Sequence, residues 1–153
     1  MKLKKIVIYT LLAVMAATTV SCRYNEGPFL SFRKPDERLV GYWKLKNVYM
    51  NGNQIDSTDV LPCQPGSYYA FFTEGMMSVT ALKDDIWYES VMGAWAFDDH
   101  CKNIEVLFTI KNRKYTYVAE IKRLTRDVLI YEFNDANDDS WRFEFESRST
   151  MYY

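Results

Sequence analysis

The residues most able to do chemistry in this chain are aspartates that stand close together, as catalytic carboxylates and metal ligands often do. Asp84-Asp85 and Asp98-Asp99 form pairs, and Asp135-Ala136-Asn137-Asp138-Asp139 matches the first five positions of a calcium-binding loop by residue type. The calcium pattern lacks the glycine and the distant glutamate that complete such a loop. All three groups fall between apolar runs, where aspartate is favoured because its side chain hydrogen-bonds to the backbone of a turn. We therefore interpret them as turns and predict no metal site.

The other residue types used in catalysis are scarce. The only histidine, His100, follows Asp98 and Asp99 in the same turn. No Ser-His-Asp set, His-Glu-x-x-His pattern or phosphate-binding glycine loop is apparent in the sequence. Because a nucleophile or general base needs neighbours that orient and activate it, the sequence predicts a protein that is not an enzyme and that needs no cofactor.

The first cysteine ends a secretory signal. Basic residues near the start precede an apolar run at 6–17 that is too short for a comfortable transmembrane span. The segment ends in Thr19-Val20-Ser21-Cys22, which resembles the lipobox of bacterial lipoproteins, although leucine is commonest where Thr19 stands. The resemblance implies that residues 1–21 are a signal peptide that is removed. It also implies that Cys22 carries a lipid, and several acyl chains would anchor the protein stably to a membrane.

The residues after Cys22 have the composition of a tether. Residues 22–38 contain Gly27, Pro28 and Pro35, scattered charge and no sustained period, and we expect them to join the lipid to a folded domain at 39–153. Surface-exported lipoproteins of similar kind often carry an acidic cluster directly after the cysteine, whereas residues 23–27 contain one acid. The expected location is therefore the outer membrane of a bacterial cell envelope, facing the periplasm.

The other two cysteines, Cys63 and Cys101, raise the question of a disulfide. An even pair in a compartment where disulfides form invites a bridge. The expected strand order argues against it, because Cys63 precedes one strand and Cys101 follows a strand two further on. Such points lie at opposite ends of a barrel, ~20 Å or more apart at ~3.3 Å per residue, whereas a bridge needs Cα atoms within ~7 Å. A disulfide between Cys63 and Cys101 remains possible only if residues 54–66 fold back along the barrel.

Period-two alternation dominates the chain after Leu39. In the clearest run, at 104–110, isoleucine, valine and phenylalanine alternate with polar residues. Turn residues separate such runs about every ten positions, as at Asn51-Gly52, which suits a type I′ hairpin. The expected strands cover residues 39–50, 68–72, 76–82, 87–97, 104–110, 115–124, 128–133 and 141–146, with a short return strand at 54–57 left open. About eight strands with short links predict an all-β, antiparallel up-and-down meander that closes into a barrel and so removes its edges.

Two Gly-x-Trp triplets add a family resemblance. Gly41-Tyr42-Trp43 opens the first strand and Gly93-Ala94-Trp95 lies in mid-domain; in this order and spacing they are similar to small bacterial lipocalin-like lipoproteins. The resemblance implies a lipocalin-like (calycin) barrel in which Gly41, Trp43, Gly93 and Trp95 are structural. It also implies a cation–π contact between the first-strand tryptophan and an arginine from the end of the chain, for which Arg142 and Arg148 are the candidates. The second motif of large lipocalins is not visible, which argues against a roomy cavity.

Two functions stay open for such a barrel. In the first, inward aromatic side chains contact a small apolar or amphipathic ligand. In the second, the same side chains fill the barrel, and the protein is a structural or protein-interaction module of the envelope. A cavity of about 300 Å³ or more would favour the ligand. The inward residues are expected to be Trp43, Tyr69, Phe71, Trp95, Phe108, Tyr117 and Phe143.

Charge excludes a nucleic-acid partner and predicts the character of one rim. Once the three lysines of the signal are removed, the 19 basic residues fall to 16 against 20 acidic ones, and no basic stripe exists for nucleic acid. Alternate links of a meander fall at the same end of the barrel, so several aspartates are expected to gather there. This acidic rim, which would repel anionic ligands, consists of Asp84, Asp85, Asp135, Asp138 and Asp139, opposed by Arg113 and Lys114.

Overall fold

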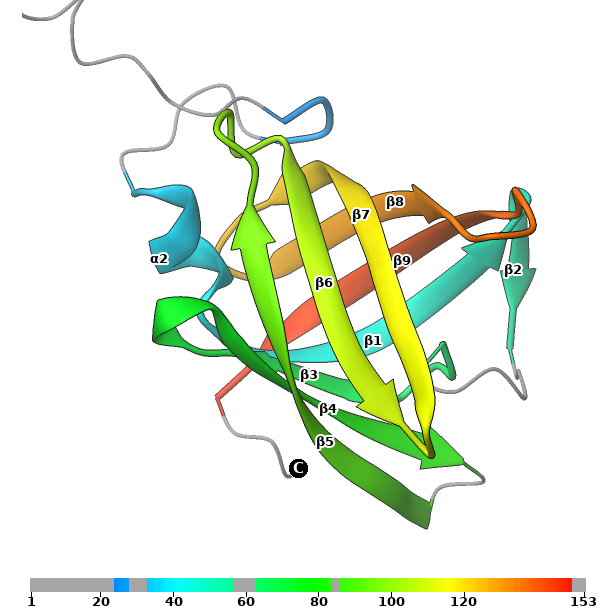
Figure 1. The fold of residues 1–153 in the computed structure, drawn as a ribbon. Coiled ribbons are helices and arrows are strands. Elements are labelled where there is room, and N and C mark those ends of the chain that lie inside the picture. The colour runs from blue at the N-terminus through cyan, green and yellow to red at the C-terminus, as the bar shows by residue number, and fades with distance from the viewer. Residues whose placement is uncertain (1–23, 28–32, 57–62, 84–85, 150–153) are drawn as a thin grey trace, which may run out of the picture.

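The computed structural model describes residues 24–27, 33–56, 63–83 and 86–149, and the strands among them form one antiparallel sheet closed into a barrel (Figure 1). The sheet order is β2-β1-β3-β4-β5-β6-β7-β8-β9, and β1 also pairs with β9. The predicted all-β meander is confirmed: eight strands close the barrel, and β2 is one extra strand. The strands are β1 (Gly41–Met50), β2 (Asn53–Ile55), β3 (Tyr68–Phe71), β4 (Met76–Lys83), β5 (Ile86–Phe97), β6 (Asn103–Ile110), β7 (Arg113–Leu124), β8 (Val128–Asn134) and β9 (Ser140–Arg148).

β1 joins the two halves of the barrel. One of its edges pairs with β9 from Tyr42 to Met50, and the other pairs with β3 only from Gly41 to Lys44. Further along, the same edge pairs with β2 across the predicted Asn51-Gly52 turn, where both residues have positive φ. Between these two pairings, Leu45 exchanges backbone hydrogen bonds with Gly66 and Ser67, and this holds residues 63–67 against the barrel.

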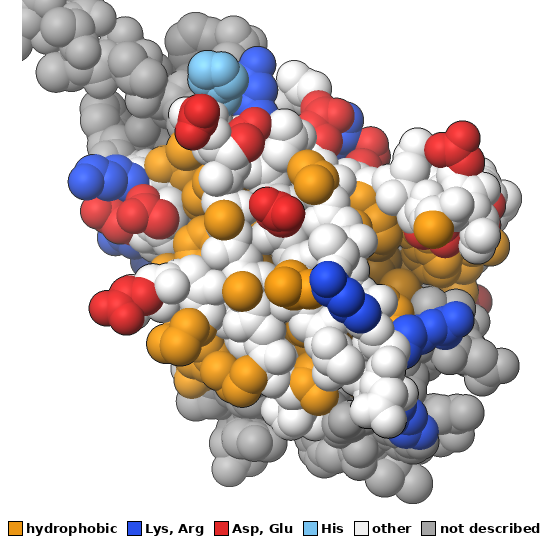
Figure 2. All heavy atoms as spheres, in the orientation of Figure 1, with side chains coloured by type: hydrophobic (Ala, Val, Ile, Leu, Met, Phe, Trp, Pro, Cys, Tyr) orange, Lys and Arg blue, Asp and Glu red, His pale blue; other side chains and the backbone are white. Residues whose placement is uncertain are grey.

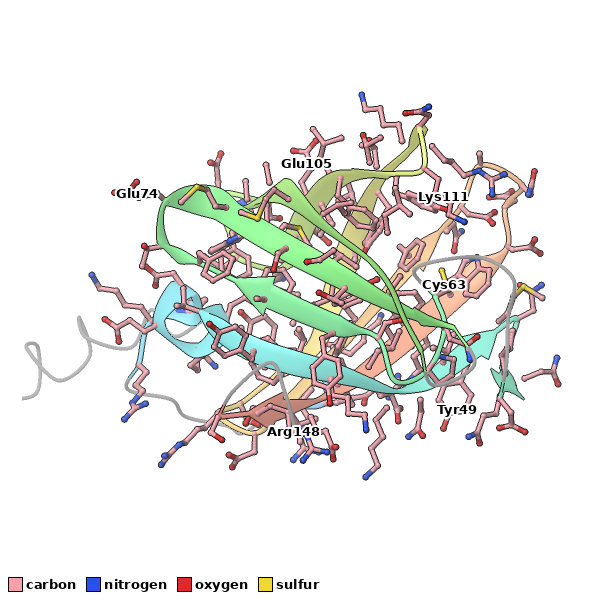
Figure 3. All side chains as sticks on the ribbon, turned by 90° about the horizontal axis from the view of Figure 1, so that it is seen from below. Tyr49, Cys63, Glu74, Glu105, Lys111 and Arg148 are labelled. Atoms are coloured by element: carbon pink, nitrogen blue, oxygen red, sulfur yellow. The ribbon has the colours of Figure 1, made fainter. Side chains whose placement is uncertain are left out.

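Figure 3 distinguishes the two ends of the barrel, with Cys63 and Lys111 at one end and Glu74 at the other. We call the first the open end; it holds the β6–β7 link and the β8–β9 link at 135–139. The other is the closed end, where the helix α2 (Pro35–Leu39) and the 3-10 turn η1 (Thr73–Gly75) lie. The sequence predicted strand from Leu39, but Pro35 in the first turn, with Asp36 beside it, favours a short helix instead.

The two Gly-x-Trp triplets lie in the core. Trp43 is 1% exposed, and its indole Nε1–H donates to the Leu39 carbonyl at 2.7 Å, which joins β1 to α2. Trp95 Nε1–H donates to the carbonyl oxygens of Met76 and Phe72, at 2.8 and 3.1 Å. Position 93 requires glycine because the neighbouring strand lies very close: a Cβ atom there would stand 2.3 Å from the Leu107 carbonyl oxygen. These contacts hold the closed end together.

The described part of the expected tether packs on the barrel. Tyr24 is 3% exposed, and the Glu26 backbone N–H donates to the Lys122 carbonyl at 2.7 Å. Arg38 is also buried; its guanidinium donates to the Leu124 carbonyl at 2.8 Å and lies 5.4 Å from the centre of the Tyr24 ring. Residues 24–27 therefore rest against β7 near the closed end.

The expected contact of Arg142 with Trp43 is wrong. Arg142 lies between the inward Trp141 and Phe143 in β9, so alternation turns it outward, and its ion-pair partners are Glu26, Glu132 and Glu144. The other candidate, Arg148, pairs with Glu146. The arginine that is buried at the closed end is Arg38, which precedes β1.

The disulfide that the sequence left open is absent. Cys63 and Cys101 are both thiols, one buried and one half-buried. Cys63 precedes β3 at the open end, and Cys101 lies in the β5–β6 link, which strand parity places at the closed end. The separation expected from the meander therefore explains why they do not meet. Within the described residues, no helix is long and apolar enough to cross a membrane.

Candidate functional site

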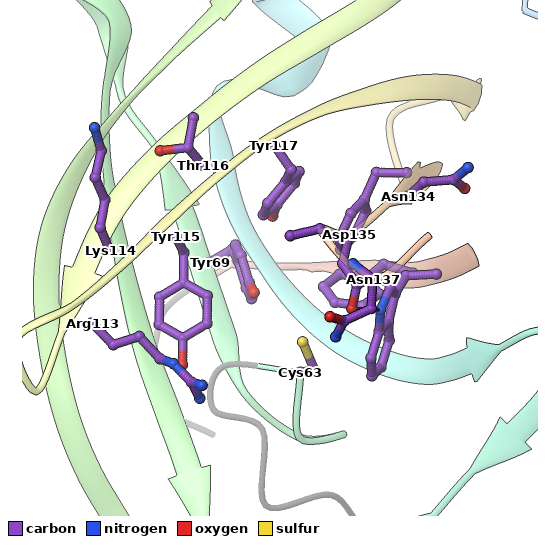
Figure 4. Close-up of a pocket in the computed structure, with 14 residues that line it drawn as sticks. Cys63, Tyr69, Arg113, Lys114, Tyr115, Thr116, Tyr117, Asn134, Asp135 and Asn137 are labelled. Atoms are coloured by element: carbon purple, nitrogen blue, oxygen red, sulfur yellow. Dashed lines mark hydrogen bonds between the residues drawn. The ribbon is translucent and has the colours of Figure 1, made fainter. Parts of the chain in front are cut away.

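The open end of the barrel contains a cavity of about 330 Å³ (Figure 4). Its walls come from the first residues of β7, the end of β8, the β8–β9 link and the start of β9, and Cys63 and Tyr69 complete it. The barrel is therefore not filled at this end. The lining residues are Cys63, Tyr69, Arg113, Lys114, Tyr115, Thr116, Tyr117, Phe133, Asn134, Asp135, Ala136, Asn137, Trp141 and Phe143.

Aromatic rings make the apolar wall. Tyr117 stacks on Phe133 with ring centres 4.1 Å apart and planes 13° from parallel. Tyr115 stacks in the same way on Phe108, at 5.2 Å and 17°. Offset or parallel rings held by their neighbours give a flat, rigid surface that suits a ring or a short apolar body.

Phenol hydroxyls give this wall its polar groups. The Tyr117 and Tyr131 hydroxyls lie 2.9 Å apart and share a hydrogen bond. The Tyr69 hydroxyl is fully buried and has no hydrogen-bond partner among the described residues. Burial raises the pKa of all three phenols. They therefore stay protonated in the physiological range and can donate a hydrogen bond.

The Cys63 thiol also lines the cavity (Figure 4). Burial, followed by the negative charge of Asp135, raises its pKa to about 12. A nucleophilic cysteine needs a depressed pKa. Cys63 is therefore a neutral lining group, and the cavity offers no activated thiol.

The charged groups at the mouth are two cations and one carboxylate. Arg113 and Lys114 line the cavity, as does Asp135. The Asp135 carboxylate accepts hydrogen bonds from the backbone N–H groups of Asn137 and Asp139 and from Trp141 Nε1–H, at 2.8, 3.1 and 3.1 Å. Burial by itself would raise the pKa of Asp135, but these three hydrogen bonds outweigh it and lower that pKa below its ordinary value. Its charge is thus committed to holding the β8–β9 link.

Three residues of the predicted acidic rim, Asp135, Asp138 and Asp139, lie in the β8–β9 link at the open end, and Asp135 lines the cavity. Asp138 and Asp139 do not line the cavity, and Asp139 accepts a hydrogen bond from Asn51 at 2.8 Å. Asp84 and Asp85 lie outside the described residues. The Asp98 carboxylate instead closes its own turn by accepting from the backbone N–H groups of Lys102 and Asn103.

Three of the seven predicted inward residues reach the cavity: Tyr69, Tyr117 and Phe143. Trp43, Phe71, Trp95 and Phe108 are buried deeper in the core. Sequence reasoning placed Arg113 and Lys114 at this rim, but it did not assign Cys63, Tyr115, Phe133 and Trp141 to the site. The signal for Tyr115 was present, because Tyr115 shares the strand parity of Tyr117.

A second hollow of about 440 Å³ lies at the closed end, between α2 and η1. Of its six lining residues, Asp36, Glu37, Val40, Thr73 and Glu74 are exposed, and only Trp95 is buried. It is a surface depression that would leave a ligand in water. Among the described residues, no group of three or more histidine, cysteine or acidic side chains is arranged to hold a metal ion.

The outer wall carries apolar side chains over β4 to β7, which Figure 2 shows as orange groups on this face. Met76, Met92, Leu107 and Val118 are 48%, 62%, 38% and 60% exposed. Two of them are linked through Ala94, which pairs with both Met76 and Leu107. Clustered exposed apolar side chains are a feature of interaction surfaces.

Comparisons with known proteins give a distant likeness in fold. No protein-family model matches the sequence, and no curated protein sequence is significantly similar to it. Among solved structures, the chain is similar to a lipocalin-like protein from Bacteroides uniformis, with 15% identity and a TM-score of 0.49 over 72% of this chain and 99% of that one. It is also similar to an uncharacterized protein from Bacteroides eggerthii, with 14% identity and a TM-score of 0.44 over 72% and 99% of the two chains.

Proposed function

We propose that the protein is a bacterial envelope lipoprotein whose barrel binds a small amphipathic ligand at its open end. The observation that carries the proposal is the cavity of about 330 Å³, which lies within the range of ~300–1,000 Å³ for small-molecule sites. Its lining combines aromatic walls with a few placed polar groups, as such sites do. Protonated phenols and a neutral thiol are suited to binding, and we infer that the cavity does not catalyse a reaction.

A fluorescence titration with the neutral amphiphile N-phenyl-1-naphthylamine tests the site. The dye should bind the protein with enhanced emission. Ala136→Trp, in the loop at the mouth, should abolish this binding, whereas Ala94→Trp, the same change on the outer wall, should leave it intact. Equal binding by both variants would show that the dye uses another surface. Native mass spectrometry of protein purified from its own envelope would then reveal a retained ligand as added mass.

The proposed anchor is a lipid on Cys22, with the protein on the periplasmic face of the outer membrane. Its support is the signal segment at 1–21 and the cysteine that directly follows it. Cys22→Ala should abolish incorporation of radiolabelled palmitate and leave the precursor uncleaved or release it from membranes. Cys101→Ala is the matched control and should be labelled and membrane-bound like the unchanged protein. A Cys22→Ala protein that is processed and bound normally would contradict the anchor.

A second candidate function, binding of a protein partner in the envelope, is favoured by the exposed apolar side chains of β4 to β7. Replacing two of them, as in Met92→Lys with Val118→Lys, should disperse a complex detected by cross-linking in intact cells and leave dye binding in the cavity unchanged. If the double variant cross-links as before, this face is not the contact surface.

A further inference from the structure

We propose that the ligand is a compact aromatic acid, whose anionic group is held at the mouth by Arg113 and whose second polar group hydrogen-bonds to Tyr69. This inference deepens the proposed ligand-binding function and rests on it. It follows from three parts of the cavity: an arginine that forms no ion pair with a described residue, a stacked aromatic wall, and a buried hydroxyl that forms no regular hydrogen bond within the described part of the chain.

Arg113 is the cation that faces the cavity. It begins β7 opposite the buried Ile110 and has the same strand parity as Tyr115 and Tyr117. In Figure 4 the Arg113 and Tyr115 side chains lie on the same side of the strand, whereas Lys114, which also contributes to the lining, extends to the other side. Arg113 is in no ion pair with a described residue, unlike Arg142, which holds three carboxylates. A guanidinium with both edges available binds a carboxylate or sulfonate by two parallel hydrogen bonds.

Tyr69 is the polar group at the inner part of the cavity. Its ring is fixed edge-on between Phe108 and Phe145, with ring centres 6.4 and 5.1 Å away, so its hydroxyl cannot turn to water. Figure 4 shows that hydroxyl directed into the cavity. The Tyr69 hydroxyl makes no hydrogen bond of normal geometry with a described residue, although it lies close enough to Tyr117 to influence the pKa of that phenol. A ligand group that accepts or donates a hydrogen bond there would satisfy this buried hydroxyl.

The volume and the aromatic wall of the cavity indicate that the apolar part of the ligand is a compact ring. About 330 Å³ lies at the small end of ligand sites, which disfavours a long acyl chain. The stacked pairs Tyr117–Phe133 and Tyr115–Phe108 present flat faces on which a ring can stack. Asp135, the one carboxylate among the described lining residues, is occupied by its three hydrogen bonds and would not compete with an anionic group for Arg113.

Three compounds that share one ring separate these contributions by isothermal titration calorimetry. They are 3-(4-hydroxyphenyl)propionate, 3-phenylpropionate, which lacks the hydroxyl, and tyramine, which replaces the acid by a cation. At low salt the hydroxylated acid should bind about tenfold more tightly than either analogue, a difference of the size that one hydrogen bond supplies. Its advantage over tyramine should shrink as salt rises, because Arg113 is exposed.

Variants assign the two contacts. Arg113→Gln should weaken both acids about tenfold without weakening tyramine. Lys111→Gln, which removes a charge at the same end of the barrel from a residue that does not line the cavity, should change neither. Tyr69→Phe loses only an unpartnered hydroxyl, so it should fold normally and make the two acids bind equally. Equal or tighter binding of tyramine would overturn the inference and favour an acidic rim, while N-phenyl-1-naphthylamine would still bind. If that dye also fails to bind, the proposed function itself is wrong.

A separate observation, the docking of residues 24–27, points to the orientation of the barrel on the membrane. A lipid on Cys22 would be attached two positions before the buried Tyr24, and two residue steps span at most ~7 Å. Tyr24 and Arg38 lie by Leu124, the last residue of β7, whereas the cavity lies by Arg113, the first. The twelve-residue strand separates them by roughly 25–35 Å along the barrel. We infer that the closed end faces the membrane and that the cavity opens to the aqueous side.

Spin labels at the two ends test this orientation, which rests on the proposed lipid anchor. In a Cys101→Ser background, Arg126→Cys labels the closed end and Ala136→Cys labels the open end, both at exposed positions. With the lipoprotein in vesicles that carry nickel-chelating headgroups, relaxation should be strong at residue 126 and weak at residue 136. The reverse order would overturn the orientation while the anchor stands. A protein that does not float with the vesicles would overturn both.

Discussion

Glu26 and Arg142, 116 positions apart in the chain, form a two-pronged ion pair in which the guanidinium donates to both carboxylate oxygens, at 2.8 and 2.9 Å. Arg142 also donates to Glu132 and Glu144, so one cation on the outer wall gathers three carboxylates. Because Glu26 belongs to the segment that follows Cys22, this pair joins the proposed anchor to the barrel. The predicted tether is therefore, in its described part, a docked segment.

Removing the charge of Glu26 should release this segment while the barrel stays folded. For Glu26→Gln we expect faster hydrogen exchange at the Glu26 amide, which donates to the Lys122 carbonyl. The loss of global stability should stay below about 1 kcal/mol, because the pair is partly exposed. Glu146→Gln, in an ion pair elsewhere on β9, is the matched control and should leave exchange at Glu26 unchanged.

The same pair predicts a pH dependence. The hydrogen bond from Arg142, opposed by partial burial, lowers the pKa of Glu26 below its ordinary value of 4.5. Since the folded-state pKa is the lower one, the docked segment gains its full stabilisation above pH 4.5 and loses it as the pH falls through the folded-state value. Exchange at the Glu26 amide, corrected for its intrinsic pH dependence, should therefore rise below pH 4.5, and the Glu26→Gln protein should lack this rise. An identical profile in both proteins would contradict the role of the pair.

Trp43 should be the most costly single position in the barrel. Trp43→Ala removes a fully buried indole and should lower the free energy of unfolding by ~3–5 kcal/mol, a large part of a typical ~5–15 kcal/mol. Trp43→Phe keeps the ring but leaves the buried Leu39 carbonyl without its donor, at a cost of about 1–3 kcal/mol. Urea melts measure both. A loss below about 1 kcal/mol for the alanine variant would mean that the core is assigned wrongly.

Gly93 should tolerate no side chain, for a reason that lies in the neighbouring strand. A Cβ atom there would stand 2.3 Å from the Leu107 carbonyl oxygen and 2.7 Å from Phe108 Cβ. Separating β5 from β6 to admit it should cost about 1–3 kcal/mol for Gly93→Ala, as overpacking does. Ala94→Gly, at the next and exposed position, makes the opposite change and should cost only about 0.5–1 kcal/mol. Similar losses in the two melts would remove the steric explanation.

The sequence predicted the strands well because period-two alternation is a local property, visible in runs such as Ile104 to Ile110. Alternation also places Arg142 outward, between Trp141 and Phe143, and the analogy that put it over Trp43 failed because it ignored that parity. The short helix α2 was missed, since five residues are too few to show a helical period. For the acidic rim, strand order predicts that Asp135, Asp138 and Asp139 share one end of the barrel, but it does not show that backbone N–H groups hold the Asp135 carboxylate in its own turn.

Cys63 offers a reporter from inside the cavity. Its pKa of about 12 means that only about one molecule in ten thousand is a thiolate at pH 8, and the thiolate is the form that reacts. Iodoacetamide should therefore alkylate Cys63 orders of magnitude more slowly than the half-buried Cys101, with peptide mass spectrometry to distinguish the two sites. Cys63 labelling should rise with pH through the range in which the protein stays folded, because the thiolate fraction grows as the pH approaches the pKa. A bound aromatic acid should slow Cys63 labelling further, because the ligand would occupy the space in front of the sulfur. If Cys63 reacts at the rate of an unfolded thiol, its burial is wrong. If 3-(4-hydroxyphenyl)propionate protects Cys101 as much as Cys63, the ligand does not occupy this cavity.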